Sequence, residues 1–132
     1  MRKLGSKLQD LENKIKDNLH STGLFSRIKI KRGDLTDPEN LPYFEYKLKE
    51  ENNNAEKYLE IINDMISKSL DANFPGFSIK SDRKDTERQN QRPYKAKIIV
   101  QPGIKIYDEE EQKYKIFNCI NETILEYLRI RI

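Results

Sequence analysis

The sequence predicts a small α+β domain in which helices pack on a mainly antiparallel sheet, in the order α-β-β-α-β-β-α. Three amphipathic stripes with helical spacing lie near the start, the middle and the end of the chain. Two pairs of segments that alternate between apolar and polar residues separate these stripes. The length of 132 residues fits a single domain over 1–132.

The first helix is predicted by large aliphatic side chains that recur at steps of three and four residues. Charged and amide side chains fill the opposite face, as in a helix that covers a core on one side. Ser21, Thr22 and Gly23 end the pattern, and glycine commonly follows the last turn of a helix. The stripe consists of Leu4, Leu8, Leu11, Ile15 and Leu19.

Two strands joined by a turn-rich loop are predicted next. Residues 24–31 and 43–49 alternate with a period of two, and the polar segment 33–42 separates them. This arrangement favours an antiparallel hairpin with one solvated face. In the first strand one face holds Leu24, Ser26, Ile28 and Ile30, and the other holds Phe25, Arg27, Lys29 and Lys31. In the second strand Phe44, Tyr46 and Leu48 oppose Tyr43, Glu45, Lys47 and Lys49.

The middle of the chain predicts a second helix and a second hairpin. A broad apolar face over 58–70 is wide enough to lie flat on a sheet, and Pro75 with Gly76 follows this helix. Strands are expected to begin at Phe77 and at Tyr94, on either side of a polar stretch.

A third helix is expected near the end of the chain. Asp108 and Glu111 have the spacing of a capping box, and acidic residues crowd the first turn, where the helix dipole favours them. An apolar stripe over 116–128 continues the helix. The sequence leaves open whether 104–107 and 128–132 are strands.

Composition excludes some classes of protein. The net charge of +3 comes from 25 basic and 22 acidic residues, so bulk charge alone does not indicate nucleic acid as a partner. The single cysteine excludes an intrachain disulfide. The sequence has no signal-peptide pattern and no apolar run of about 18 residues, so we expect a soluble chain without a membrane partner.

The stretch 81–93, SDRKDTERQNQRP, has no large apolar side chain and is predicted to be a projecting polar loop. Basic residues outnumber acidic ones over 80–97, which suits an arm that orders on an acidic partner, either protein or nucleic acid. The alternative is a solvated loop without a partner. The arm has no aromatic residue before Tyr94, so base stacking by the arm is unsupported. The partner-binding residues predicted in this arm are Arg83, Lys84, Arg88, Arg92 and Lys95.

An enzymatic interpretation rests on the triplet Glu45-Tyr46-Lys47, which fits the ExK part of a PD-(D/E)xK nuclease. Asp34 or Asp37 and, on the first helix, Glu12 would add carboxylates for Mg²⁺. Against this, both aspartates fall in the loop, and Glu45 and Lys47 are expected to be solvated.

No catalytic, cofactor-binding or metal-binding residue is therefore assigned, and we expect a protein that is not an enzyme. His20 is the single histidine and Cys119 the single cysteine, so neither has the partners that a zinc site requires.

The first part of the chain has a distinctive order of elements. An amphipathic helix leads to a strand through Phe25 and Ile28, and a polar loop ends in the strand start Leu41-Pro42-Tyr43-Phe44-Glu45-Tyr46. Over about residues 3–50 this pattern resembles the tail terminator and head–tail joining proteins of long-tailed bacteriophages. The resemblance implies a structural virion subunit without cofactors, assembled in the host cytoplasm as a homo-oligomeric ring against tail-tube, portal or connector proteins.

The alternative function is a nucleic-acid-binding or regulatory adaptor that uses the basic arm. A nuclease of the PD-(D/E)xK type ranks below both. Copy number and the identity of the partner cannot be read from the sequence.

Overall fold

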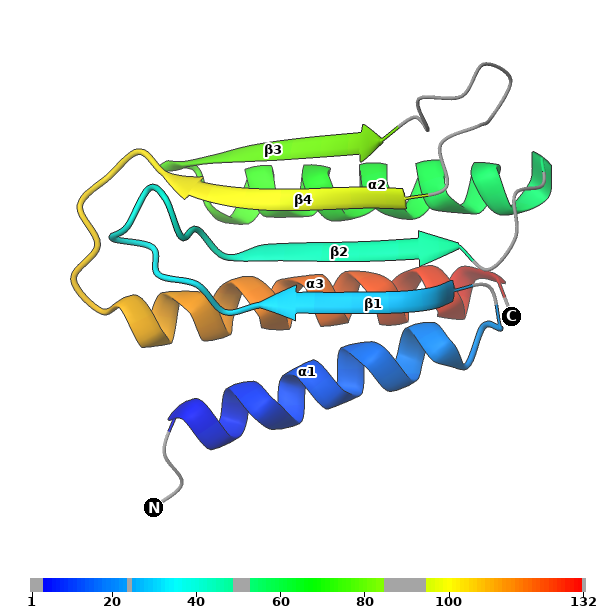
Figure 1. Ribbon diagram of the computed structural model, residues 1–132, viewed down its shortest axis with the longest axis horizontal. Helices are drawn as coiled ribbons and strands as arrows, with labels where there is room; N and C mark the ends of the chain where they lie inside the picture. Colours follow the sequence, from blue (N-terminus) through cyan, green and yellow to red (C-terminus); the bar gives the residue numbers. More distant parts are fainter. Residues whose placement is uncertain (1–3, 24, 49–52, 85–94, 132) are drawn as a thin grey trace.

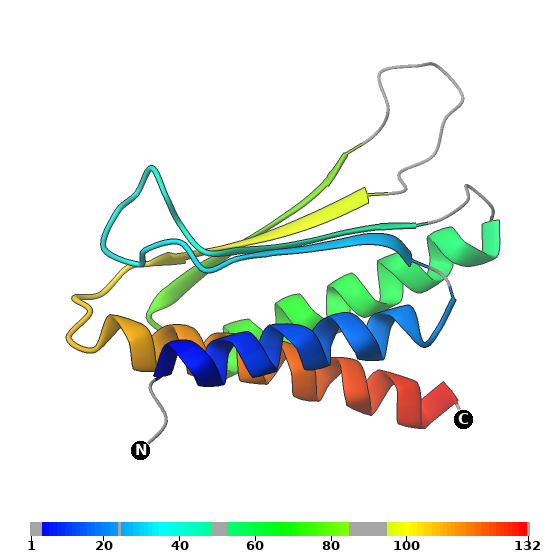
Figure 2. The same cartoon turned by 60° about the horizontal axis from the view of Figure 1, so that its bottom comes forward.

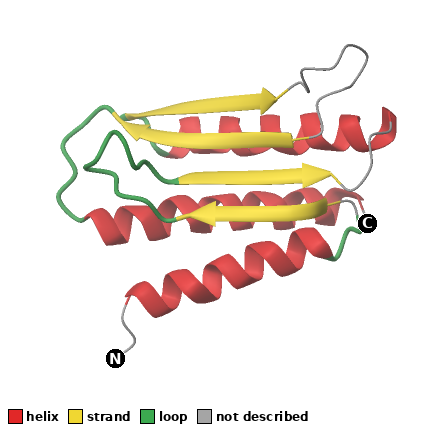
Figure 3. Ribbon diagram, in the orientation of Figure 1, coloured by secondary structure: helices red, strands yellow, loops and turns green. Residues whose placement is uncertain are grey.

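A computed structural model describes residues 4–23, 25–48, 53–84 and 95–131, and it confirms the predicted α+β class and element order. Three helices and four strands follow one another along the described chain, and Figures 1 and 3 show how they are arranged. Their bounds are α1 Leu4–His20, β1 Phe25–Lys31, β2 Tyr43–Leu48, α2 Asn53–Asn73, β3 Phe77–Lys84, β4 Lys95–Pro102 and α3 Glu109–Arg131.

The four strands form one antiparallel sheet in the order β1-β2-β4-β3. The predicted hairpin of β1 and β2 is confirmed, and β3 pairs with β4 in a second hairpin. The inner strands β2 and β4 join the two hairpins, so β1 and β3 are the edges. All three helices lie on one side of the sheet (Figure 2), and no described element covers the other side.

The core fills the space between the sheet and the helices. Four of the five residues in the predicted stripe of α1 are buried, with Leu8, Ile15 and Leu19 fully inaccessible to solvent and Leu11 4% exposed; the side chain of Leu4 lies outside the description. The strands contribute residues at every second position, because alternate strand side chains point to opposite faces. From the strands, the covered side holds Phe25, Ile28, Phe44, Tyr46, Ala96, Ile98 and Val100; from α2 and α3 it holds Leu59, Ile62, Ile66, Leu70, Ile116, Phe117, Ile120, Ile124 and Tyr127.

A bulge overturns one detail of the predicted β1 alternation. Phe25 is only 3% exposed and lies in the core, although the period of two placed it with Arg27 on the solvated face. The pairing register shifts between Phe25 and Arg27, and this β-bulge adds one residue to the strand. Phe25 and Ile28 can therefore share the covered face.

The second hairpin is longer than predicted. β3 extends through Ser81 to Lys84, where Lys84 pairs with Lys95, so the first four residues of the expected loop belong to a strand. Polar residues are tolerated there because β3 is an edge strand. The segment 85–94 lies outside the described residues.

The remaining expectations concern residues 104–107, residues 128–132 and the apolar face of α2. Residues 104–107 form no strand, and 128–131 continue α3. Ile61 is 48% exposed rather than part of the apolar face of α2. Among the described residues, no helix is both long and apolar enough to cross a bilayer.

Candidate functional site

The side of the sheet without helices is strongly basic. Seven basic side chains from all four strands alternate with the core residues and so project from this side, which we call the open face. One acidic residue, Glu45, accompanies them among the side chains that the structure describes. The resulting charge of +6 exceeds the +3 of the whole chain. The basic residues are Arg27, Lys29, Lys31, Lys47, Lys80, Lys95 and Lys97.

One row of the open face places like charges directly opposite one another. The register puts Arg27 opposite Lys47, and Lys47 opposite Lys95. On β3 the register continues with Lys84 opposite Lys95 and Asp82 opposite Lys97. Side chains at directly opposed positions lie about 4.5–5.5 Å apart at Cβ, and like charges there destabilise a sheet. The row therefore concentrates positive charge along one line across the sheet.

Glu45 occupies the centre of the next row. The register places it between Lys29 on β1 and Lys97 on β4, and its carboxylate Oε1 lies 3.5 Å from Nζ of Lys95. Glu45 is only 9% exposed, so the expectation of a solvated carboxylate is wrong. The cationic neighbours cover the carboxylate, and its negative charge offsets part of the repulsion between these cations.

A third row carries the apolar part of the open face. Tyr43 on β2 pairs with Ile99 on β4, and both side chains are half-buried. Three ammonium groups surround the Tyr43 ring: Lys97 Nζ lies 4.1 Å from the ring centroid, and Lys29 and Lys31 Nζ each lie 5.7 Å from it. Such exposed cation–π contacts are worth about 0.5–1 kcal/mol each.

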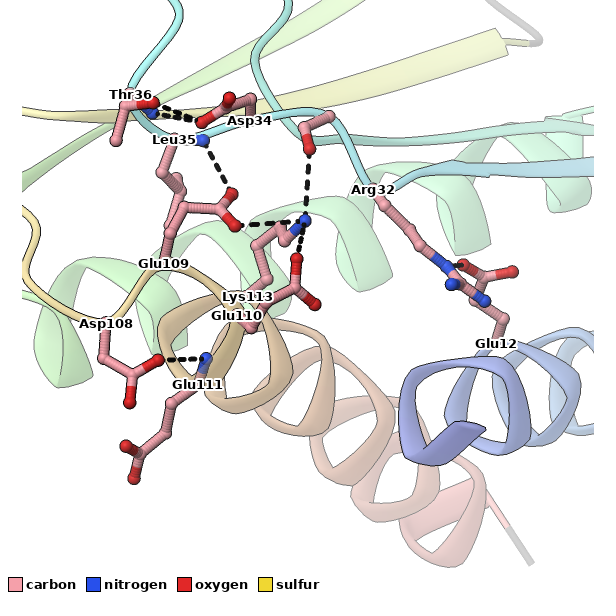
Figure 4. Close-up of polar contacts among 11 residues, drawn as sticks. Glu12, Arg32, Asp34, Leu35, Thr36, Asp108, Glu109, Glu110, Glu111 and Lys113 are labelled. Atoms are coloured by element: carbon pink, nitrogen blue, oxygen red, sulfur yellow. Dashed lines mark hydrogen bonds and ion pairs between the residues drawn. The ribbon is translucent and has the colours of Figure 1, made fainter. Parts of the chain in front are cut away.

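The loop between β1 and β2 is fastened to the start of α3 (Figure 4). Leu35 N donates to Glu109 Oε1 at 2.9 Å, and Lys113 Nζ donates to the Gly33 carbonyl at 3.2 Å. Lys113 also pairs with Glu109 at 3.2 Å and with Glu110 at 2.9 Å. These contacts fix the end of β1 and the start of β2. They therefore help to fix the register between the two strands, which defines the rows.

Gly33 makes this fastening sterically feasible. Its φ of +55° lies in the left-handed region, and a Cβ atom there would meet the Asn40 carbonyl oxygen at 2.5 Å. Burial lowers the pKa of Lys113, but its hydrogen bonds to Glu110 and Glu109 outweigh that effect, so the pKa is raised. The pKa of Asp34 is lowered, chiefly by the hydrogen bonds from the hydroxyl and the backbone N–H of Thr36.

The five predicted arm residues separate into two groups. Arg83 and Lys84 lie on β3, and Lys95 begins β4 on the open face. These three therefore belong to the sheet and not to a projecting loop. Arg88 and Arg92 lie outside the described residues.

The carboxylates of the nuclease interpretation do not converge. Glu12 lies on α1, on the covered side of the sheet, and accepts a hydrogen bond from Arg32 Nε at 2.6 Å (Figure 4). Asp34 accepts from Thr36 within the loop, whereas Glu45 lies on the open face. Among the described residues, no group of three or more His, Cys, Asp or Glu side chains could hold a metal ion.

Comparison with protein-family models, curated proteins and solved structures finds no match to this chain. The phage tail role that the resemblance implies, with its ring and virion partners, stays a prediction.

The open face was missed by sequence reasoning although part of its signal was visible. The period of two in 24–31 and 43–49 shows cations on one side of each strand. Only the pairing of β2 with β4 brings Lys47 next to Lys95, and that contact joins segments far apart in the sequence.

Proposed function

We propose that this protein is a nucleic-acid-binding module that acts through the open face of its sheet. The observation that carries the proposal is the row Arg27–Lys47–Lys95, in which the register aligns like charges on three neighbouring strands. Nucleic-acid backbones supply regularly spaced negative charges, and their neutralisation by Lys and Arg releases counterions and drives binding.

The open face also fits a nucleic acid better than an acidic protein. Tyr43 and Ile99 form a half-buried apolar pair among the cations. Such a pair suits a ligand that joins charged phosphates to flat bases. The helices on the opposite side leave the sheet accessible over the described strands (Figure 2). A four-stranded sheet that presents aromatic and basic residues is a known arrangement for binding nucleic acid.

The test measures the affinity for a labelled single strand and a labelled duplex between about 50 and about 200 mM salt. The variant with Arg27→Gln, Lys47→Gln and Lys95→Gln should lose binding, and the slope of log affinity against log salt should fall by roughly two to three. The matched control replaces Lys7, Lys14 and Lys57 by glutamine, which removes the same charge from exposed positions on α1 and α2.

The control variant should bind like the parent, since its lysines lie away from the open face. Equal losses in the two triple variants would show that net charge and not the row is responsible. Absence of binding by the parent protein at low salt, or binding only to an acidic polypeptide, would overturn the proposal.

A further inference from the structure

We infer that the open face selects single-stranded over duplex nucleic acid, with Tyr43 as the residue on which an unpaired base stacks. This inference rests on the proposed function and deepens it. It concerns the third row of the open face, where Tyr43 and Ile99 lie side by side on the inner strands β2 and β4. Tyr43 is the first residue of β2; in this row Lys31, the last residue of β1, lies on one flank and Lys80 on the other.

Tyr43 does not lie in the core, unlike the residue next to it in the chain. Its neighbours in the chain alternate as expected, with Phe44 only 1% exposed on the covered face. Tyr43 points the other way, is half-buried by its neighbours, and has no helix above it among the described elements. Aromatic side chains on an open sheet bind unpaired bases by stacking, and this contact tolerates any base because every base has a π-face.

Three ammonium groups gather at this one ring, from Lys29, Lys31 and Lys97. An exposed cation–π contact is worth about 2- to 5-fold in equilibrium terms, whereas a stacked base contributes about 5- to 150-fold in affinity. A base can therefore displace an ammonium group from the ring. The lysines then turn to the phosphates on either side of the stacked base, so their interactions are exchanged and not lost.

A duplex cannot use Tyr43 in this way. Its bases are paired and stacked inside the helix, and only its phosphates and groove edges reach a flat protein surface. A duplex therefore contacts the row Arg27–Lys47–Lys95 but makes no stacking contact with the Tyr43–Ile99 pair. A single strand contacts both.

The decisive ligands are an oligodeoxythymidine and an abasic oligomer of the same length, which share a sugar-phosphate backbone. The parent protein should bind the oligodeoxythymidine about 5- to 150-fold more tightly than the abasic oligomer. Tyr43→Leu should abolish this difference and leave affinity for the abasic oligomer within about 3-fold, since the cations remain. Tyr43→Phe keeps the ring and should retain the preference.

A spectroscopic signal separates stacking from a merely structural role. The chain contains no tryptophan, so Tyr43→Trp places a single tryptophan at the site, which can be excited selectively over the tyrosines. Its emission should be quenched by oligodeoxythymidine and much less by the abasic oligomer at equal saturation.

The outcomes distinguish the two proposals. Equal affinity of the parent for both oligomers, or a preference that survives Tyr43→Leu, would overturn stacking while the basic face stands. Failure of the parent to bind either oligomer would overturn the proposed function itself.

Discussion

The two faces of one sheet are built from the same four strands and have opposite chemistry. On β2, Phe44 and Tyr46 are each 1% exposed beneath the helices, while Tyr43 and Lys47 project from the open face. The covered face is almost entirely apolar, and the open face carries most of the cations of the strands. The difference shows that the period of two separates core packing on one face from charge on the other.

The largest effect is expected from the covered face. Phe44→Ala removes a fully buried aromatic ring and should lower the free energy of unfolding by about 3–5 kcal/mol. Tyr43→Leu at the adjacent position should cost about 1 kcal/mol or less, because that side chain is half-buried and stays apolar. Urea unfolding followed by circular dichroism measures both. Similar losses for the two variants would contradict the separation of the faces.

An intermediate effect is expected where the β1–β2 loop meets α3. Lys113→Met removes the ammonium group that bonds to Gly33, Glu109 and Glu110, and should destabilise the protein by about 1–3 kcal/mol near neutral pH. Because the pKa of Lys113 is raised by folding, its contribution is fully present below the unfolded value of about 10.4. The contribution should be lost as pH rises through the higher folded pKa.

The stability difference between the parent and Lys113→Met tests this directly. It should stay constant from neutral pH to about pH 10 and shrink above that. Lys115→Met is a matched control, because Lys115 lies on the same helix and its ion pair with Glu111 is exposed. A difference that grows with pH would contradict the assigned sign.

The smallest expected effect on the free energy of unfolding is an increase and not a decrease. Arg27→Gln removes one of two like charges that face each other across β1 and β2, so it should raise the free energy of unfolding by about 0.2–1 kcal/mol at low salt. Added salt should remove the gain, since screening already weakens the repulsion in the parent. A loss of stability at low salt would show that the row is not under electrostatic strain.

Local pattern was sufficient to predict the elements of this fold. The stripes of α1 and α3 and the alternation in β2 reflect burial on one side, which periodicity records directly. The bulge at Phe25 and Arg27 was not predictable, because one extra residue breaks the period and only the partner strand reveals it. The polar end of β3 was missed because its pairing with β4, and not its own composition, makes it a strand.

The candidate site was predictable only in part. The basic character of 80–97 was visible in the sequence, and it predicted a partner-binding arm that includes Arg88 and Arg92. Lys95 proved to lie in the sheet, opposite Lys47. The alignment of cations depends on the register between two hairpins. The hydrophobic pattern fixes which side of each strand faces the core, but which residue of β4 lies opposite Lys47 is known only from the pairing itself.

The strand order β1-β2-β4-β3 joins two consecutive α-β-β halves of the chain at a seam between β2 and β4, and α3 packs against the helices of both halves. Lys47 and Lys95 face each other across that seam, so each half alone holds only a fragment of the cation row. In the proposed function, a nucleic-acid strand that contacts both lysines bridges the two halves and opposes their separation. Under that proposal, the affinity for the strand and the stability of the contact between the two halves are thermodynamically linked.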